Sequence, residues 1–370
     1  MDFSLSDDQV SVRDLSRQLL ADVAPTAGTP APAGPDWYDS RLWARLGEAG
    51  LLGIALPVRD GGAGYGPTEL ALLAEEAGRT VARVPIAACL GGAALPLAEY
   101  GTPTQRSRLL AGVVAGTELL SAAFTEPFAD DPLAPVTAAV PEGTGWRVSG
   151  TKTAVPLART ATAVLLPASA PDGQVVLALV HGGTAGVTFV DEQTSSGEPA
   201  CTITLDGALV SAEDTLAGGR TALRFAYQRY LALLCATELG IAAEALRMAA
   251  AHTSTREQFG RPLATFQAVA VRLGNGFIDV QAMQSTLWQA LWRLEAGLPA
   301  DEAVITAAFW AAEAGERVLT SAVHLHGGLG VDTDYPLHRW FLASKVVELA
   351  LGGASWQLDQ LGRILCAGPA

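Results

Sequence analysis

The sequence predicts an α+β protein in which helices come first, strands follow, and long helices end the chain. Three observations support this fold class. Residues 1–117 read as helices separated by Gly- and Pro-containing breaks, residues 118–216 as short alternating apolar runs, and residues 217–370 as long helical stretches. We therefore expect an N-terminal helical domain, a middle β-domain and a C-terminal helical bundle.

The N-terminal zone contains three candidate helices. One covers residues 4–20, a second covers 37–49, and a third begins at Pro67. The glycine-rich run 61–66 precedes the third helix. It lacks the preceding strand and the following lysine of a phosphate-binding loop, so we interpret it as a connection between helices.

The middle zone is built from short apolar runs separated by turns such as Asp206-Gly207. This texture predicts a small antiparallel β-domain. The candidate strands are 134–140, 146–148, 163–166, 175–180, 187–190 and 201–205.

The C-terminal zone predicts four long helices, with breaks at glycine-containing turns. Antiparallel helices of this length joined by short loops form a bundle. The approximate spans are 221–258, 264–296, 300–326 and 336–366.

Composition narrows the class of protein. Hydrophobic residues make up 49% of the chain and the net charge is -14, which argues against nucleic acid as a partner because phosphates require a basic surface. The N-terminus has no basic stretch followed by an apolar one, and no uninterrupted apolar run is long enough for a membrane span. We expect a cytoplasmic protein with unpaired thiols. The cysteines are Cys89, Cys201, Cys235 and Cys366.

Two segments of the last zone point to chemistry. The first, residues 256–267, contains Arg256, then Phe259-Gly260, and ends in Phe266-Gln267. An arginine can bind a pyrophosphate through two hydrogen bonds, although a helix corner with a surface arginine explains the residue types equally well. The second, residues 324–336, reads His-Leu-His-Gly-Gly-Leu-Gly and continues to Asp-Tyr-Pro.

These two segments closely resemble the cofactor signatures of the acyl-CoA dehydrogenase family, and Thr125-Glu126-Pro127 resembles the run that opens the middle domain of its members. The resemblance covers the whole chain. It implies an N-terminal helical domain, a middle antiparallel β-barrel-like domain and a C-terminal four-helix bundle. It also implies an oxidoreductase acting on CH-CH groups that desaturates an acyl-CoA, with electron-transfer flavoprotein as the acceptor.

The resemblance further implies FAD, bound in extended form across a subunit interface. The chain keeps the residues that match the ADP half of FAD, including a pyrophosphate arginine, an aromatic residue near the adenine, and glycines that let the backbone approach the dinucleotide. A histidine stands where many members have glutamine and can still donate a hydrogen bond. The matched residues are Arg256, Phe259, Gln267, His324, Gly327 and Gly328.

The residues that match the flavin-ring half are lost. Asp131 replaces a serine that touches the flavin or the substrate, and it places a charge beside a ring that becomes anionic on reduction. Ala154 stands where the family has a tryptophan, and Pro156 where a threonine bonds the flavin. Alanine offers little stacking surface, and proline has no N–H to donate.

The catalytic glutamate of the family is also missing, because Leu351 occupies its position. Some members carry the base on the first long bundle helix, where this chain has Tyr230. The ordinary pKa of a tyrosine, about 10, is too high for an efficient base at neutral pH. Glu348 and Glu238 remain open as relocated bases, beside their reading as ordinary paired carboxylates. We expect no catalytic residue in this chain.

Three histidines invite a metal-site interpretation. His324 and His326 are two residues apart at a helix end and point in different directions, and no carboxylate lies at ligand spacing from them or from His338. We expect no metal.

The kept and the lost residues together predict the non-catalytic partner in a heterotetrameric acyl-CoA dehydrogenase. Residues 306–316 and 351–355 look like those of the glutamate-less subunits of α2β2 enzymes in steroid side-chain degradation, which implies a steroid or another bulky acyl-CoA. Two alternatives stay open. One is a homotetrameric dehydrogenase or other flavin enzyme with a relocated base, and the other is a flavin-free scaffold subunit.

Overall fold

The computed structural model describes residues 4–28 and 32–367, which form two compact units. A helical unit takes in the described residues of 1–31, 67–82 and 231–370, and a mixed unit takes in those of 32–66 and 83–230. The boundary between the units falls inside one long helix, at residues 230 and 231. The three-domain division stays a prediction.

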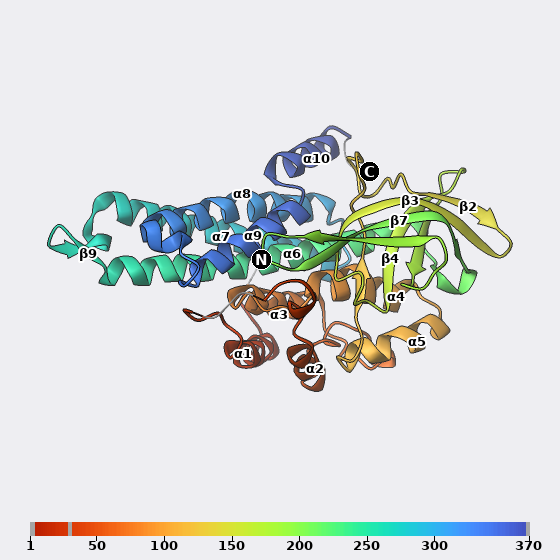
Figure 1. The fold of residues 1–370 in the computed structure, drawn as a ribbon, viewed down its shortest axis with the longest axis horizontal. Coiled ribbons are helices and arrows are strands. Elements are labelled where there is room, and N and C mark those ends of the chain that lie inside the picture. The colour runs from red at the N-terminus through yellow and green to blue at the C-terminus, as the bar shows by residue number, and fades with distance from the viewer. Residues whose placement is uncertain (1–3, 29–31, 368–370) are drawn as a thin grey trace. The chain divides into compact units, whose positions relative to one another are not determined.

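The helical unit is a bundle whose long helices run side by side, with α7 against α8 and α8 against α9 and α10 (Figure 1). A short hairpin, β9 with β10, separates α6 from α7 at one end of the bundle. Residue 231 onward of α6 belongs to this unit. The elements are α1 (Asp7–Ala21), α3 (Pro67–Arg79), α6 (Gly219–Thr255), β9 (Glu257–Gln258), β10 (Arg261–Pro262), α7 (Gln267–Glu295), α8 (Asp301–His326), α9 (Leu337–Ala350) and α10 (Ala354–Ala367).

Glycines allow α3 and α6 to approach closely. A Cβ atom at Gly78 would overlap the carbonyl oxygen of Thr237, and one at Gly240 would overlap the carbonyl oxygen of Glu75. Neither glycine needs a left-handed backbone, so the constraint is purely one of space. Backbone therefore packs on backbone at this crossing, which only glycine permits.

The predicted helix over 336–366 is wrong as a single element. It ends at Ala350 and restarts at Ala354, because Gly352 and Gly353 have φ angles of 82° and 78°. Two consecutive left-handed residues cannot continue a right-handed helix. The turn between α9 and α10 buries Leu351 completely.

The mixed unit is built on a sheet with the strand order β6-β7-β3-β2-β4-β5-β8, while β1 pairs with β4. Most pairs are antiparallel as predicted, but β1 pairs with β4 in parallel, and Ala138 of β2 meets Ser169 of β4 in parallel. The strands are β1 (Leu120–Ala122), β2 (Ala138–Glu142), β3 (Gly145–Pro156), β4 (Ala163–Ser169), β5 (Val175–Val180), β6 (Val187–Gln193), β7 (Pro199–Val210) and β8 (Thr215–Leu216).

Several predicted bounds needed correction. The strand expected over 134–140 begins only at Ala138, and β1 was not predicted at all. The helix expected from 37 begins at Ser40, where the Asp39 side chain accepts the Leu42 N–H and caps it. The first bundle helix ends at Thr255 rather than 258, because the hairpin begins there.

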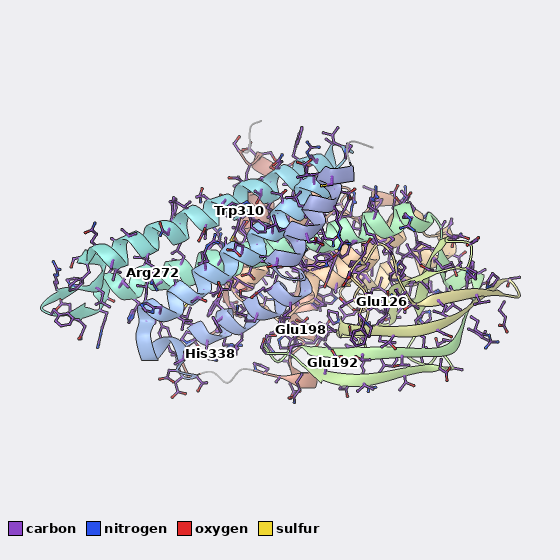
Figure 2. All side chains as sticks on the ribbon, turned by 90° about the horizontal axis from the view of Figure 1, so that it is seen from above. Glu126, Glu192, Glu198, Arg272, Trp310 and His338 are labelled. Atoms are coloured by element: carbon purple, nitrogen blue, oxygen red, sulfur yellow. The ribbon has the colours of Figure 1, made fainter. Side chains whose placement is uncertain are left out.

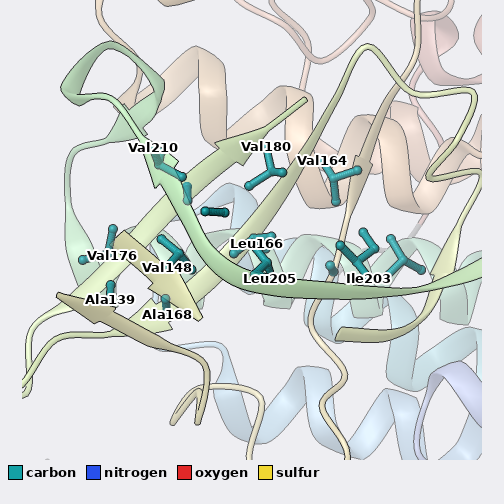
Figure 3. Packing of buried hydrophobic residues seen from close by; sticks show 14 of the residues in the cluster. Ala139, Val148, Val164, Leu166, Ala168, Val176, Val180, Ile203, Leu205 and Val210 are labelled. Atoms are coloured by element: carbon teal, nitrogen blue, oxygen red, sulfur yellow. The ribbon is translucent and has the colours of Figure 1, made fainter. Parts of the chain in front are cut away.

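The sheet encloses a core of small aliphatic side chains, seen from close by in Figure 3. Val148, Leu166, Ile203 and Leu205 are among its most buried members, and β5 is buried along its whole length. Burying an aliphatic side chain of this size contributes roughly 1.5–3 kcal/mol. The core thus stabilises the sheet through side chains from several strands, including β3, β4, β5 and β7.

Short helices surround this sheet within the mixed unit: α2 (Ser40–Glu48), α4 (Leu95–Tyr100) and α5 (Pro103–Val114). Thr102 and Gln105 form a reciprocal cap at the start of α5. The same Gln105 amide donates to the carbonyl oxygens of Glu213 at 2.9 Å and Thr215 at 3.0 Å. A single buried side chain therefore both caps a helix and anchors it beside β8.

The glycine-rich run 61–66 is a structural connection, as predicted. The N–H groups of residues 61–65 donate to carbonyl oxygens of residues 53–58, for example Ala63 to Gly53 at 3.0 Å and Gly64 to Leu56 at 2.9 Å. A Cβ at Gly62 would overlap the Leu56 carbonyl oxygen. These N–H groups are already used and cannot cradle a phosphate. Among the described residues, no helix is long and apolar enough to cross a membrane.

Candidate cofactor-binding site

The hairpin between α6 and α7 presents an aromatic ring to solvent. Phe259 and Gly260 form its two-residue turn with φ angles of 54° and 75°, as the favoured tight hairpin turn requires. Phe259 is 92% exposed. The left-handed conformation costs a non-glycine residue about 1–2 kcal/mol. The turn therefore holds the ring in solvent, with the centre of the Phe266 ring 6.2 Å away.

The base of the hairpin is built from local contacts. The N–H of Leu263 donates to the Arg256 carbonyl oxygen at 2.9 Å, and the Arg261 guanidinium lies 4.0 Å from the centre of the Phe266 ring. These contacts leave the Arg256 side chain exposed, and Gln267 is exposed as the first residue of α7. The structure therefore gathers three predicted site residues at one end of the helical unit.

The end of α8 supplies a backbone that a ligand can approach. Gly327 has a φ angle of 61°, and a Cβ atom at Gly327 or Gly328 would meet nothing within 4 Å. His324 is exposed beside them. By contrast, a Cβ atom at Gly330 would lie 2.6 Å from the Val323 carbonyl oxygen, so this glycine is needed for packing.

Two histidines join the α8 end to the α6 end. The rings of His252 and His326 stack with centres 4.4 Å apart, and His252 lies one turn before Arg256. His326 Nδ1 lies 2.8 Å from the Ala322 carbonyl oxygen, and its Nε2 lies 3.2 Å from the Tyr335 hydroxyl. Burial lowers the pKa of both histidines, which favours neutral rings that can stack. The two predicted cofactor segments are thereby held at the same end of the bundle.

No role was predicted for His252, which lies outside both predicted cofactor segments, or for Tyr335, which lies within the second segment. The predicted trio His324, His326 and His338 does not converge, since His326 is buried against Tyr335 while His338 Nδ1 contacts the Tyr335 carbonyl oxygen at 2.7 Å. The residues that the structure describes include no group of three or more His, Cys, Asp or Glu that could hold a metal ion.

The mixed unit carries the positions matched to the flavin ring. Ala154 lies in a bulge of β3 with a φ angle of 52°, and its N–H donates to Glu192 Oε2 at 3.1 Å. Thr202 donates its hydroxyl to the other oxygen of the same carboxylate. The Glu192 carboxylate, labelled in Figure 2, therefore accepts the N–H of the bulge. Glu192 adds a negative charge where the resemblance expects an aromatic ring to stack.

Asp131 and Pro156, the other residues that differ from the family pattern here, form hydrogen bonds within the chain. Asp131 Oδ1 accepts the N–H of Leu133 at 2.8 Å and closes a local turn. Ser121 donates to the carbonyl oxygen of Pro156 at 2.5 Å. Neither Asp131 nor Pro156 offers a donor that could replace the missing threonine.

A buried ion pair holds the loop that follows Thr125-Glu126-Pro127. Glu126 accepts from Lys152 Nζ at 2.8 Å, from the N–H of Val136 at 2.6 Å and from the N–H of Thr137 at 2.7 Å. Burial alone would raise the pKa of Glu126, but the charge and hydrogen bond of Lys152 lower it. Burial lowers the pKa of Lys152 to about 8. Glu126 is therefore a structural residue that ties β3 to the loop before β2.

The candidate bases lie in different surroundings. Leu351 is fully buried, and Glu348 forms an ion pair with Lys345 at 2.7 Å. Tyr230 is buried, and both burial and the neighbouring charge of Glu198 raise its pKa further. The phenol is thus an even weaker proton acceptor than a free tyrosine.

Glu238 is a packed carboxyl inside the helical unit. It is 1% exposed, and its Oε1 accepts from Ser344 Oγ at 2.6 Å while its Oε2 has no partner among the described residues. A Cβ atom at Gly315 would overlap this carboxyl, so the glycine provides its space. Burial raises the pKa of Glu238 to about 8, which favours the neutral acid.

Sequence reasoning also missed Glu198, in the loop before β7. Protein atoms around its carboxyl raise the pKa to about 7, although part of the residue remains exposed. Glu192, on the paired strand, faces Ala200 in the sheet register, two residues from Glu198. Figure 2 labels both carboxylates.

Comparison with known proteins identifies the family. Residues 6–117 match the acyl-CoA dehydrogenase N-terminal domain, and residues 220–366 match the C-terminal domain. The chain is 39% identical over 341 residues to acyl-CoA dehydrogenase FadE27 of Mycobacterium tuberculosis, covering 90% of each protein. This chain belongs to the acyl-CoA dehydrogenase family. Its members are FAD-dependent oxidoreductases that act on CH-CH groups, with helical, sheet and helical domains in that order.

Two solved structures extend the similarity over the full length. One, described as a variant of the Tcur3481-Tcur3483 steroid acyl-CoA dehydrogenase, is 41% identical with a TM-score of 0.90 and covers 99% of each chain. The other, the ChsE4-ChsE5 complex from Mycobacterium tuberculosis, is 36% identical with a TM-score of 0.91 and covers 100% of each chain. The acyl-CoA dehydrogenase fold predicted from the sequence is confirmed.

Proposed function

We propose that this chain is the non-catalytic subunit of a heteromeric acyl-CoA dehydrogenase. It would bind the ADP half of FAD through Arg256, Phe259, Gln267 and the end of α8, while a catalytic subunit holds the flavin ring and the acyl-CoA. When bound, FAD would serve as the hydride acceptor. The α,β-desaturation would take place in the partner, with electron-transfer flavoprotein as the acceptor.

One contrast carries the proposal. The residues matched to the ADP half are accessible. A Cβ atom at Gly327 or Gly328 would meet no atom within 4 Å, and the Phe259 side chain is exposed to solvent. The ring-side positions offer a carboxylate at the Ala154 N–H and a buried leucine at the position of the base. The chain thus fits one half of FAD and not the other.

The substrate class follows from the relatives. Two full-length structural relatives are described as two-protein assemblies, and one of them as a steroid acyl-CoA dehydrogenase. A steroid side-chain thioester or a similarly bulky acyl-CoA is therefore the substrate we propose for the complex. The free cysteines agree with a cytoplasmic site of action.

The proposal is tested by expressing this chain by itself and together with a homologue from the same genome that carries the catalytic glutamate. We expect the lone chain to retain little flavin and the complex to hold about one FAD per pair of chains, measured by absorbance after gel filtration. We also expect the complex, but not the lone chain, to dehydrogenate a steroid acyl-CoA. A lone chain that holds one FAD per chain and turns over substrate would contradict it, and a complex without FAD would indicate a scaffold.

One observation favours the second candidate, a homotetramer with a relocated base. Glu198 has a pKa of about 7, suited to proton transfer at neutral pH, and lies close enough to Tyr230 to raise its pKa. If the lone chain is active, Glu198→Gln should abolish turnover while FAD content stays unchanged. Activity that survives this substitution would remove Glu198 as the base.

A further inference from the structure

Two stacked histidines connect the chain segments that carry the residues matched to the ADP half of FAD. The rings of His252 and His326 have centres 4.4 Å apart, and their planes differ by 23°. The Arg256 N–H donates to the His252 carbonyl oxygen at 2.8 Å, and His326 directly precedes Gly327. His326 is 6% exposed. The stack therefore joins the end of α6 to the end of α8 at the backbone that carries the predicted site.

The contacts of His326 determine which of its ring nitrogens carries the hydrogen. Its Nδ1 lies 2.8 Å from the Ala322 carbonyl oxygen, which can only accept, so Nδ1 must be the donor. In the neutral ring Nε2 is then an acceptor, and the Tyr335 hydroxyl lies 3.2 Å from it and can donate. A proton added at Nε2 would remove this acceptor and leave a positive charge on a buried ring. The geometry thus suits the neutral form of His326.

The neighbours of the stack disfavour a charge on either ring. Burial, the His326 ring and the Arg256 guanidinium all lower the pKa of His252, in that order of size. Burial also lowers the pKa of His326, and the hydrogen bond with Ala322 opposes this effect only in part. Both rings are therefore neutral at pH 7, where two flat neutral rings can stack.

The remaining charged groups at this end of the unit do not compensate a charge on the stack. Among the described residues, no carboxylate forms an ion pair with either ring. Arg247 would add positive charge, but it pairs with Glu244 at 2.6 Å. The titratable groups on the adjoining elements include Arg247 and Glu244 of α6, His324 of α8, Asp332, Asp334 and Tyr335 of the following turn, and His338 of α9.

We propose that the neutral stack positions Arg256 relative to Gly327 and Gly328, and that protonation of the stack loosens this end of the helical unit and weakens the binding of the ADP half of FAD. The inference rests on the proposed function and adds to it a regulation by pH. Two protonated rings 4.4 Å apart would repel each other, and Arg256 would add a third positive charge one turn away. His252 and His326 are thus positioning residues, which act on FAD through Arg256 and the end of α8.

The direction of the pH effect follows from the lowered pKa of each histidine. A histidine whose pKa is lower in the folded than in the unfolded chain contributes stability that is fully present above its ordinary pKa of about 6.5. This contribution is lost as the pH falls through that value toward the pKa of the folded state. FAD retention should therefore be highest near pH 7.5 and should fall below about pH 6.5.

The test compares pH 7.5 with pH 5.5 in two measurements on the complex of the full chain with the glutamate-bearing homologue. Hydrogen exchange, corrected for its intrinsic rate, should accelerate about fivefold or more at residues 250–256 and 322–330 when the pH is lowered, but not in β3 and β7. FAD retention, measured by flavin fluorescence after dilution, should fall about fivefold or more over the same interval. The first measurement follows the chain itself and does not depend on turnover.

His252→Phe should reduce both pH effects to about twofold or less, because phenylalanine keeps a stacking ring, cannot ionise, and attracts a protonated His326 across its face. His252→Gln likewise cannot ionise and serves if the phenylalanine variant does not fold, as judged by circular dichroism. The matched control is His181→Gln in the mixed unit, where His181 contacts the Thr162 carbonyl oxygen. This control should keep the pH effects of the wild type.

The outcomes separate the inference from the proposed function. If FAD is retained equally at both pH values, or is lost equally in the wild type and His252→Phe, the inference is wrong, although a complex with FAD at pH 7.5 still supports the proposed function. If hydrogen exchange accelerates while FAD retention stays constant, the stack does not position Arg256 for FAD and the inference fails. A complex without FAD at pH 7.5 would overturn the proposed function, and the inference with it.

Discussion

At the scale of single residues, surroundings decide what each titratable group can do. Glu126, Glu198 and Glu238 share one side chain but differ in their partners. Glu126 accepts hydrogen bonds from Lys152 and two N–H groups, which lower its pKa against the effect of burial. Glu198 has no such compensation, and for Glu238 the hydrogen bond from Ser344 does not offset burial, so the pKa of each is raised. A glutamate in the sequence is therefore a candidate base only after its neighbours are known.

Arg256→Ala should weaken FAD retention in the heteromeric complex. The substitution removes a charge-assisted contact of about 1.5–3 kcal/mol, which corresponds to roughly a tenfold to hundredfold loss of affinity. Flavin fluorescence after dilution measures the loss. Arg261→Ala is a control, because its guanidinium packs on the Phe266 ring instead. Equal retention in wild type and Arg256→Ala would mean that Arg256 does not contact FAD.

Glu238→Gln should make the chain more stable at high pH. The pKa of Glu238 is raised from its ordinary value to about 8, so the folded state holds the proton more tightly than the unfolded state, and stability is lost as the pH rises toward 8. The side-chain carbonyl oxygen of a glutamine can still accept the hydrogen bond from Ser344, and the side chain cannot ionise. Denaturant unfolding should give similar free energies near pH 4.5 and a gain on the order of 1–3 kcal/mol at pH 9. Parallel pH profiles for the two proteins would refute this account.

At the scale of elements, glycines set where helices stop and how closely they approach. Gly352 and Gly353 break the last predicted helix through their left-handed backbone, whereas Gly78 and Gly240 serve a helix crossing through their lack of a side chain. The helix break at Gly352 and Gly353 follows from the local backbone preference of glycine. The need for glycine at positions 78 and 240 is explained only by the contact between α3 and α6.

Gly240→Ala should destabilise the helical unit, since the added methyl group would overlap the Glu75 carbonyl oxygen. Overpacking of this kind costs about 1–3 kcal/mol, which thermal melting would show as a lowered Tm. Gly362→Ala on α10 is the matched control, because a Cβ atom there meets nothing within 4 Å and alanine favours helix. An unchanged Tm for Gly240→Ala would show that the crossing can widen freely.

At the scale of the whole molecule, the chain combines the acyl-CoA dehydrogenase fold with a leucine at the position where the family resemblance expects the catalytic glutamate. The chain belongs to the acyl-CoA dehydrogenase family, and both its N-terminal and its C-terminal domain models are matched. The sheet core and the bundle are retained although Ala154, Pro156 and Leu351 stand where the family resemblance expects other residues. Under the proposed function, such a chain lends a surface to a partner while the chemistry takes place in that partner.

Leu351→Glu alone should not create dehydrogenase activity in the lone chain. The Ala154 N–H would still donate to Glu192, and Pro156 would still lack an N–H, so the ring site would not be restored. Dye reduction with an acyl-CoA substrate measures the outcome, and Leu351→Gln controls for the effect of a polar group at this buried position. A clear gain of turnover in Leu351→Glu only would show that the ring pocket is functional.

The sequence by itself determined the family, the order of helical and sheet regions, the glycine-containing break near Gly260 and the absence of a glutamate at Leu351. These features depend on local backbone preference and on residue identity at fixed spacing, both of which a sequence displays directly. The tertiary structure alone decided the parallel pairing of β1 with β4, the stacking of His252 on His326 and the carboxylate of Glu192 at the Ala154 bulge. Those contacts join residues far apart in the chain, and burial and charge pairing arise only when such residues meet.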